Sequence, residues 1–169
     1  MTPLVSIIMG STSDLKVMSK AAEFLNQQGI PFEMNALSAH RTPQAVEQFA
    51  QGAAARGVKV VIAGAGMAAA LPGAVAASTP LPVIGVPISG GVLDGIDATL
   101  AILQMPPGIP VATVAINGAL NAAILAMQML ALSDPALATR LADYKANLCN
   151  KVEKANQELA ALQYPFKTN

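Results

Sequence analysis

Short apolar stretches alternate with helix-like stretches along most of the chain. The apolar stretches are rich in β-branched residues and end at Gly, Ser or Pro, which favours buried strands. They cover residues 4–9, 31–37, 58–63, 81–87 and 110–115. Strands of this kind separated by helices are typical of a parallel, doubly wound sheet. The sequence therefore predicts an α/β three-layer sandwich, flavodoxin-like, with a sheet of five or slightly more strands.

Helical periodicity fills the intervals between the strands. Helices are predicted over residues 14–28, 43–56, 96–103 and 117–132. Gly29 ends the first, and Thr42-Pro43 begins the second as an N-cap followed by Pro in the first turn. The fourth carries no charge on any face, so we expect it to be buried all round, inside the domain or between subunits.

Charged residues return after residue 133 on a helical period and predict an amphipathic helix over 135–162. This helix is longer than one small domain needs to cover, so we expect part of it to pack on a neighbouring subunit. At 169 residues, the chain 1–169 is expected to form a single α/β domain.

The surface is short of charge. Charged residues make up 12% of the chain and hydrophobic residues 53%, and between Lys59 and Asp134 only Asp94 and Asp97 are charged. An ordinary soluble domain has about 25% charged residues. We therefore expect a homo-oligomer with a large apolar interface.

Several environments and partners are disfavoured. The formal net charge is zero, so neither nucleic acid nor an anionic membrane is an expected partner. Prolines interrupt every long apolar run, and the N-terminus lacks the basic region of a signal peptide. Cys149 has no intrachain partner, which fits a reducing cytoplasm and indicates neither a metal site nor a nucleophile.

Small and polar residues follow the predicted strands at one edge of the sheet. Ligands of parallel sheets bind at the carboxyl ends of the strands, where such loops can form one pocket. The loops are residues 11–14, 38–41, 64–73 and 88–91. In the first, Ser11 and Ser13 can donate to a phosphate or hydroxyl and Asp14 suits a ribose diol. Taken alone, this turn favours the simpler interpretation that Ser13 or Asp14 is an N-cap.

His40 is the only histidine and stands beside Arg41. Imidazole titrates near neutral pH, and a guanidinium can hold a phosphate or carboxylate with two hydrogen bonds. A strand-end histidine next to a solvated arginine is the alternative interpretation. The convergence of the four loops favours the site, with His40 as base and Arg41 as anchor.

Several other site chemistries lack their motifs. No Cys/His cluster or concentrated carboxylate set suggests a metal, and no phosphate-binding Gly-x-x-x-x-Gly-Lys-Ser/Thr pattern is present. The glycines at 64 and 66 lack the third glycine of a dinucleotide site, and no serine lies in a nucleophile-elbow pattern. Cofactor-free proton transfer on a phosphorylated small molecule remains.

The motifs also carry a family resemblance. They are GSTSD at 10–14, SAHRTP at 38–43, AGAG at 63–66, LPG at 71–73, GVP at 85–87, QMP at 104–106 and GIPV at 108–111. In sequence and spacing the chain closely resembles, over nearly its whole length, the class I N5-carboxyaminoimidazole ribonucleotide mutases of purine biosynthesis, in the phosphoribosylaminoimidazole carboxylase catalytic subunit family.

The resemblance implies an isomerase that moves a carboxylate from the exocyclic nitrogen to the ring carbon of an aminoimidazole ribonucleotide. It implies no ATP, metal, biotin or other cofactor, and a cytoplasmic homo-octamer. The N-carboxylate leaves as CO2, is held in a closed, dry pocket and is recaptured by the ring carbon, and His40 shuttles the proton.

The same resemblance implies the substrate contacts. Asp14 would bind the ribose hydroxyls, Arg41 the 5′-phosphate and Ser38 the ring or carboxylate, while residues 64–66 line the base. The implied substrate-binding residues are Ser11, Ser13, Asp14, Ser38, Ala39, Arg41, Gly64, Ala65, Gly66, Ala70 and Leu71.

One motif departs from the family. Where the family usually reads Gly-Gly-Ala-Ala-His-Leu-Pro-Gly, residues 66–73 read GMAAALPG, so Ala70 replaces a second pocket histidine. Two alternatives therefore stay open: a class II-type enzyme that carboxylates aminoimidazole ribonucleotide directly with CO2, and a non-catalytic nucleotide-binding protein. The intact motif around His40 favours an active mutase.

Overall fold

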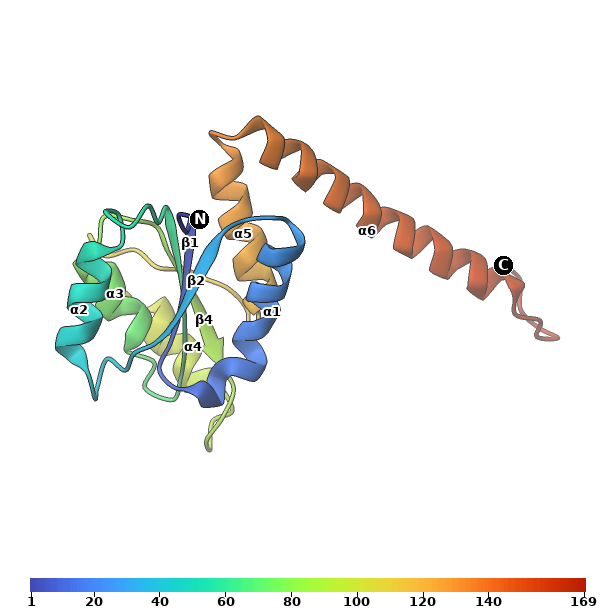
Figure 1. Ribbon diagram of the computed structural model, residues 1–169. Coiled ribbons are helices and arrows are strands. Elements are labelled where there is room, and N and C mark those ends of the chain that lie inside the picture. The colour runs from blue at the N-terminus through green and yellow to red at the C-terminus, as the bar shows by residue number, and fades with distance from the viewer. The chain divides into compact units, whose positions relative to one another are not determined.

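The computed structural model describes all 169 residues and contains one five-stranded parallel sheet (Figure 1). Its strands are β1 Val5–Met9, β2 Phe32–Ala36, β3 Val60–Gly66, β4 Val83–Ile88 and β5 Ala112–Thr113. Their spatial order is β2-β1-β3-β4-β5, with every neighbouring pair parallel. This is the flavodoxin-like order. The predicted α/β fold class is confirmed.

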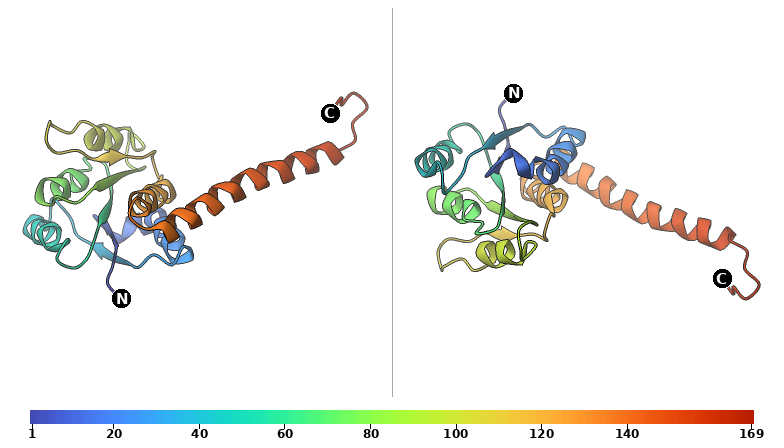
Figure 2. Two further views of the ribbon diagram at one scale, coloured as in Figure 1. Left: turned by 90° about the horizontal axis from the view of Figure 1, so that it is seen from above. Right: turned by 90° about the horizontal axis from the view of Figure 1, so that it is seen from below.

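Helices cover both faces of the sheet. They are η1 Thr12–Asp14, a short 3-10 helix, and α1 Leu15–Gln27, α2 Pro43–Gly52, α3 Leu71–Ser78, α4 Ile96–Leu103, α5 Ala119–Ala131 and α6 Pro135–Ala161. Figure 2 shows α1 and α5 on one face and α2, α3 and α4 on the other. Side chains of α2, α3 and α4, such as Val46, Val75 and Ile102, pack against buried residues of the sheet in one apolar core.

The structure differs from the predicted elements most clearly at β3, α3, β5 and α2, and by one or two residues at the ends of several others. β3 continues to Gly66, so the expected loop begins three residues later. α3 was not predicted, because its eight residues include no charged side chain that would reveal a helical period. β5 has only two residues, and α2 ends at Gly52, followed by turns to residue 57.

The uncharged helix α5 is not buried on every face. Ala119, Ala122, Ala123, Ala126 and Met127 have no exposed surface, whereas Leu120 is 40% exposed. The prediction of burial all round therefore does not hold within one chain. Burial within the chain accounts for the absence of charged residues only on the face of α5 that carries these alanines and Met127.

The chain divides into two compact units, Met1–Met129 and Leu130–Asn169. The second contains α6, which begins where Asp134 accepts hydrogen bonds from the backbone N–H groups of Ala136 and Leu137. Large apolar side chains along α6, among them Leu148, Val152 and Leu159, are exposed. The predicted long C-terminal helix is thus present, and none of the helices combines the length and apolarity needed to span a lipid bilayer.

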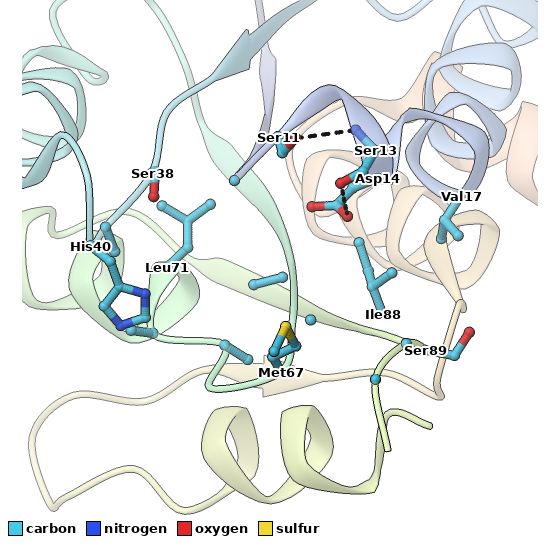
Figure 3. Close-up of a pocket in the computed structure, with 18 of the residues that line it drawn as sticks. Ser11, Ser13, Asp14, Val17, Ser38, His40, Met67, Leu71, Ile88 and Ser89 are labelled. Atoms are coloured by element: carbon cyan, nitrogen blue, oxygen red, sulfur yellow. Dashed lines mark hydrogen bonds between the residues drawn. The ribbon is translucent and has the colours of Figure 1, made fainter. Parts of the chain in front are cut away.

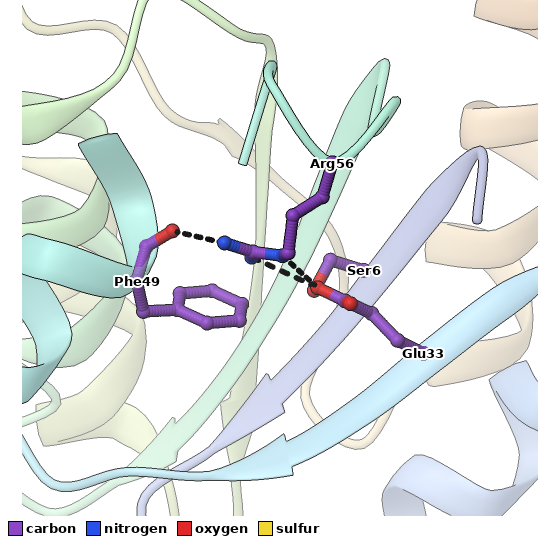
Figure 4. Close-up of polar contacts among 4 residues, drawn as sticks. All are labelled: Ser6, Glu33, Phe49 and Arg56. Carbon is purple, nitrogen blue, oxygen red and sulfur yellow. Dashed lines mark hydrogen bonds and ion pairs between the residues drawn. The ribbon is translucent and has the colours of Figure 1, made fainter. Parts of the chain in front are cut away.

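An ion pair joins β2 to the segment that precedes β3, and a hydrogen bond from β1 reaches the same carboxylate (Figure 4). Arg56 donates from Nη2 to Glu33 Oε1 at 2.9 Å and from Nη1 to the carbonyl oxygen of Phe49 at 3.2 Å, and its guanidinium lies 4.7 Å from the centre of the Phe49 ring. Ser6, which is fully buried in β1, donates to the same Oε1 at 2.9 Å. A buried hydroxyl without a partner is costly, so Glu33 stabilises β1 as well as holding Arg56.

Candidate active site

A cavity of about 690 Å³ lies at the carboxyl edge of the sheet (Figure 3). Segments that follow all five strands contribute to it, together with the first turns of α1. The reversal of strand order between β1 and β3 opens a crevice at this edge, which is where doubly wound sheets bind ligands. The position of the site follows from the topology.

The turn after β1 supplies hydroxyls and one carboxylate. The Ser13 N–H donates to Ser11 Oγ at 3.3 Å, and Ser13 Oγ donates to Asp14 Oδ1 at 3.2 Å. Ser11 is the N-cap of η1, whereas the Asp14 side chain makes no capping hydrogen bond to α1. Burial raises the pKa of Asp14 and the hydrogen bond from Ser13 partly opposes this rise. Asp14 is therefore a carboxylate with unused acceptor capacity at the cavity wall.

The loop after β2 is a turn closed by hydrogen bonds between its ends. The Ser38 N–H donates to Thr42 Oγ1 at 3.0 Å, and Thr42 donates from Oγ1 and from its backbone N–H to the Ser38 carbonyl at 3.0 and 2.7 Å. The ring of His40 takes no part in the hydrogen bonds that hold this turn. The turn therefore holds the backbone of His40, and its hydrogen bonds use neither nitrogen of the ring.

Arg41 connects this turn to the end of β1. Its Nη2 donates to the carbonyl oxygen of Gly10 at 2.9 Å, and its Nε donates to Ser38 Oγ at 3.3 Å. A guanidinium has five N–H donors, so several remain for a ligand. His40 and Arg41 are both exposed, so this chain alone does not seal the cavity on that side.

Gly64 does not line the cavity and does not lie in a loop. It pairs with Val86 within the sheet, and a Cβ at this position would overlap Sδ of Met18 in α1. Its role in lining the base stays a prediction, and in the structure the missing side chain serves the packing of α1 on β3. Ala65 and Gly66, the last residues of β3, do reach the cavity.

The segment after β3 is held in an unusual backbone conformation. Met67 and Ala69 have positive φ angles of 53° and 38°, a region that non-glycine residues rarely adopt. Ala70 and Leu71 follow and also line the cavity, and Leu71 begins α3. Met67 is 64% exposed. The methyl group of Ala70 brings no polar group to this wall.

Ten of the eleven predicted substrate-binding residues and His40 surround this one cavity, and Gly64 is the exception. The cavity has further lining residues that were not predicted as site residues: Gly10, Lys16, Val17, Lys20, Met67, Ala69, Ile88, Ser89, Gly90, Gly91 and Asn117. The loop at 88–91 was expected at this edge, but Asn117 was assigned to a helix start. Lys16 and Lys20, one helical turn apart, add two further cations to the lining of a cavity that has one carboxylate.

Comparison with known proteins shows which family the chain belongs to. Residues 4–151 match the AIR carboxylase family. The chain belongs to the AIR carboxylase family. A relative in Mycobacterium tuberculosis, named N5-carboxyaminoimidazole ribonucleotide mutase, is 53% identical over 160 residues, 95% of this chain and 92% of that protein. The mutase of the same name from Pyrococcus horikoshii is 52% identical over 93% of this chain and 89% of its own length.

AIR carboxylase family members also occur in longer chains and in solved structures. The phosphoribosylaminoimidazole carboxylase of Saccharomyces cerevisiae is 51% identical over 96% of this chain, which corresponds to 28% of the yeast protein. The crystal structure of Treponema denticola PurE superposes with a TM-score of 0.85 and 32% identity, and covers 93% of this chain and 98% of that one. The mutases of Mycobacterium tuberculosis and Pyrococcus horikoshii are thus matched over about nine tenths of their length, and the yeast carboxylase over less than a third.

Proposed function

We propose that this protein is an N5-carboxyaminoimidazole ribonucleotide mutase, which interconverts N5-carboxyaminoimidazole ribonucleotide and 4-carboxy-5-aminoimidazole ribonucleotide in purine biosynthesis. The observation that carries the proposal is the cavity that gathers His40, Arg41 and the hydroxyls of the turn after β1 at the switch point of the sheet. The mutase names of relatives that match nearly the whole chain support it.

The substrate contacts follow from the charges and donors of the cavity. Arg41 binds the 5′-phosphate with the guanidinium donors that Gly10 and Ser38 leave unused. Asp14 accepts hydrogen bonds from the ribose hydroxyls, and Ser11 and Ser13 lie beside it. Ala65 and Gly66 line the base, where the lack of large side chains lets the heterocycle approach the backbone.

His40 moves one proton in the proposed reaction. As imidazolium it gives a proton to the exocyclic nitrogen while the bond from that nitrogen to the carboxylate carbon breaks and CO2 forms. The nucleophilic ring carbon then attacks CO2, which makes the new carbon–carbon bond. The neutral imidazole finally removes the proton from that ring carbon and restores the aromatic ring, so no proton is gained or lost overall.

A second copy of the chain would close the cavity and cover the apolar surface. Around α4, Val92 is 100% and Ile96 59% exposed, and Leu93, Leu100 and Leu103 are also exposed. A patch of this kind marks an interaction site. We propose a homo-oligomer, an octamer as the family resemblance implies, in the cytoplasm. In it residues 1–169 form one domain whose α6 packs on a neighbouring subunit through its exposed apolar side chains.

The test is an assay of the purified protein with N5-carboxyaminoimidazole ribonucleotide in the absence of ATP, metal and added bicarbonate. The proposal expects 4-carboxy-5-aminoimidazole ribonucleotide to form. Product only from aminoimidazole ribonucleotide with added bicarbonate would establish the class II-type carboxylase instead. Ribonucleotide binding without any turnover would establish the non-catalytic alternative. In that case the replacement of the family histidine by Ala70 would account for the loss of activity.

A further inference from the structure

The residue pair Asn117 and Ser89 joins the ends of β5 and β4 at the cavity. Asn117 Nδ2 donates to Ser89 Oγ at 2.8 Å, and Asn117 Oδ1 accepts from the Ser89 N–H at 3.0 Å. The Asn117 N–H donates to the carbonyl oxygen of Pro87 at 2.8 Å. Both residues are partly buried and both line the cavity. Every polar group on this carboxamide is thus directed at one neighbouring residue.

The backbone N–H of Ser89 determines the orientation of the carboxamide. An N–H can only donate, so the atom that faces it must be Oδ1, and the atom that faces Ser89 Oγ must be the donor Nδ2. Ser89 Oγ therefore acts as an acceptor toward Asn117. The hydroxyl proton of Ser89 has no acceptor in this pair and stays available to a molecule in the cavity.

The residues beyond Ser89 have little to hold them in place. A Cβ at Gly90 would meet no atom within 4 Å, and one at Gly91 would meet only Cγ of Met67 at 3.8 Å. Gly90, Gly91 and Val92 are exposed. Gly90 and Gly91 contribute no side chain to hold this wall, and the Asn117 carboxamide anchors its first residue through two hydrogen bonds to Ser89.

We propose that Asn117 is a positioning residue that holds the Ser89–Gly91 wall and leaves the Ser89 hydroxyl as a hydrogen-bond donor to an acceptor oxygen of the ribonucleotide. This inference rests on the proposed function. Figure 3 shows Ser89 on the side of the cavity opposite His40. The pair therefore acts on substrate binding, and the proton transfer at His40 proceeds without it.

Two variants of Asn117 separate the proposed role from general stability. Asn117 has a φ of 58°, which glycine adopts without strain, so Asn117→Gly removes the carboxamide and keeps the backbone. Asn117→Asp keeps the acceptor for the Ser89 N–H but presents a second acceptor to the Ser89 hydroxyl, which takes that proton away from the cavity. Ser89→Ala removes the hydroxyl itself.

The experiment measures kcat and KM with N5-carboxyaminoimidazole ribonucleotide, and Tm, for these three variants and for the exposed control Asn121→Asp. We expect KM to rise about three- to tenfold in each of the three, as for the loss of one neutral hydrogen bond, with kcat within about twofold of wild type. Asn117→Asp should keep its Tm, and the control should match wild type.

Three results would overturn the inference. If the wild type is active and KM is unchanged in Asn117→Asp and Ser89→Ala, the Ser89 hydroxyl does not bind the substrate. The proposed function would then still stand. A fall of kcat and Tm together at unchanged KM would make Asn117 a purely structural residue. A wild type that neither binds nor converts the ribonucleotide would overturn the proposed function and this inference with it.

Discussion

Arg41 Nη2 donates to the carbonyl oxygen of Gly10 at 2.9 Å. The side chain that follows His40 is thus hydrogen-bonded to the last residue before the Ser11–Asp14 turn. The two residues are 31 positions apart and come from the loops that follow β1 and β2. This hydrogen bond links the histidine side of the cavity to the side that carries Asp14. It also orients the remaining guanidinium donors.

Replacing Arg41 by Ala should weaken ribonucleotide binding. The loss of charge-assisted hydrogen bonds costs about 1.5 to 3 kcal/mol, which raises the dissociation constant by roughly ten- to 150-fold. Arg41→Lys should recover only part of this loss, since a lysine cannot make the bond to Gly10 and a two-point contact to phosphate together. Calorimetric titration measures the affinities, and Lys59→Ala, at an exposed position outside the cavity lining, is the control. An unchanged affinity in Arg41→Ala would remove Arg41 from the phosphate site.

His40→Asn should abolish turnover while ribonucleotide affinity stays within a fewfold of wild type. Asparagine occupies a similar volume but cannot accept and release a proton near neutral pH, and general acid–base catalysis contributes about 10²- to 10⁴-fold. The assay is product formation from N5-carboxyaminoimidazole ribonucleotide, with binding measured on the same preparation. Residual turnover near the wild-type rate would refute the proton-shuttle assignment.

Asp14→Asn should raise the stability of the free protein at neutral pH and weaken ribonucleotide binding. Burial raises the pKa of Asp14 in the folded state, so its ionised form opposes folding above that pKa. The stability advantage of Asn over Asp should shrink as pH falls through the raised pKa, because the wild-type carboxyl becomes neutral there. Urea unfolding of both proteins between neutral and acid pH measures this difference. If the difference in unfolding free energy between the two proteins did not change with pH, burial would not raise the pKa of Asp14.

Gly64→Ala should destabilise the fold. A Cβ would overlap Sδ of Met18 and come within 3.1 Å of Cδ1 of Ile88, and overpacking of this kind costs about 1 to 3 kcal/mol. Gly10→Ala is the matched control for stability, since a Cβ there meets nothing within 4 Å. Urea denaturation gives both values. If Gly64→Ala were as stable as wild type and had lost only ribonucleotide affinity, Gly64 would be a binding residue after all.

Arg56→Ala should lower the free energy of unfolding by about 2 kcal/mol, since it removes hydrogen bonds between charged groups and the contact with the Phe49 ring. Turnover per folded molecule should not change, because Arg56 does not line the cavity. Arg56→Lys should lose less, as it retains the charge beside Glu33. Equal urea midpoints for wild type and Arg56→Ala would show that solvent screening cancels the ion pair.

Prediction from the sequence succeeded where a local pattern carries the information. The helix of residues 96–103 was predicted with both boundaries, and α6 within one residue at its C-terminal end. It failed at α3, whose residues are all apolar or small, and at β5, whose apolar run of six residues pairs with β4 at only two. Periodicity needs a contrast between buried and exposed positions, and α3 does not offer one.

The candidate site shows the same division. His40, Arg41 and the Ser11–Asp14 turn, which line the cavity, were predicted as site residues because unusual residue types stand beside predicted strand ends. Asn117 was missed because its role depends on Ser89, which lies 28 positions earlier in the chain. The packing of Met18 against Gly64 was not predicted, because only the folded structure brings these two residues together.

By itself the sequence determined the alternation of strands and helices, the shortage of surface charge and the residues able to carry proton and phosphate chemistry, since all of these are local or compositional. The tertiary structure decided which loops share a cavity, that Arg41 reaches Gly10, and that Asn117 governs the hydrogen bonding of Ser89. These are relationships between residues distant in the chain, and the order of strands in the sheet brings them together.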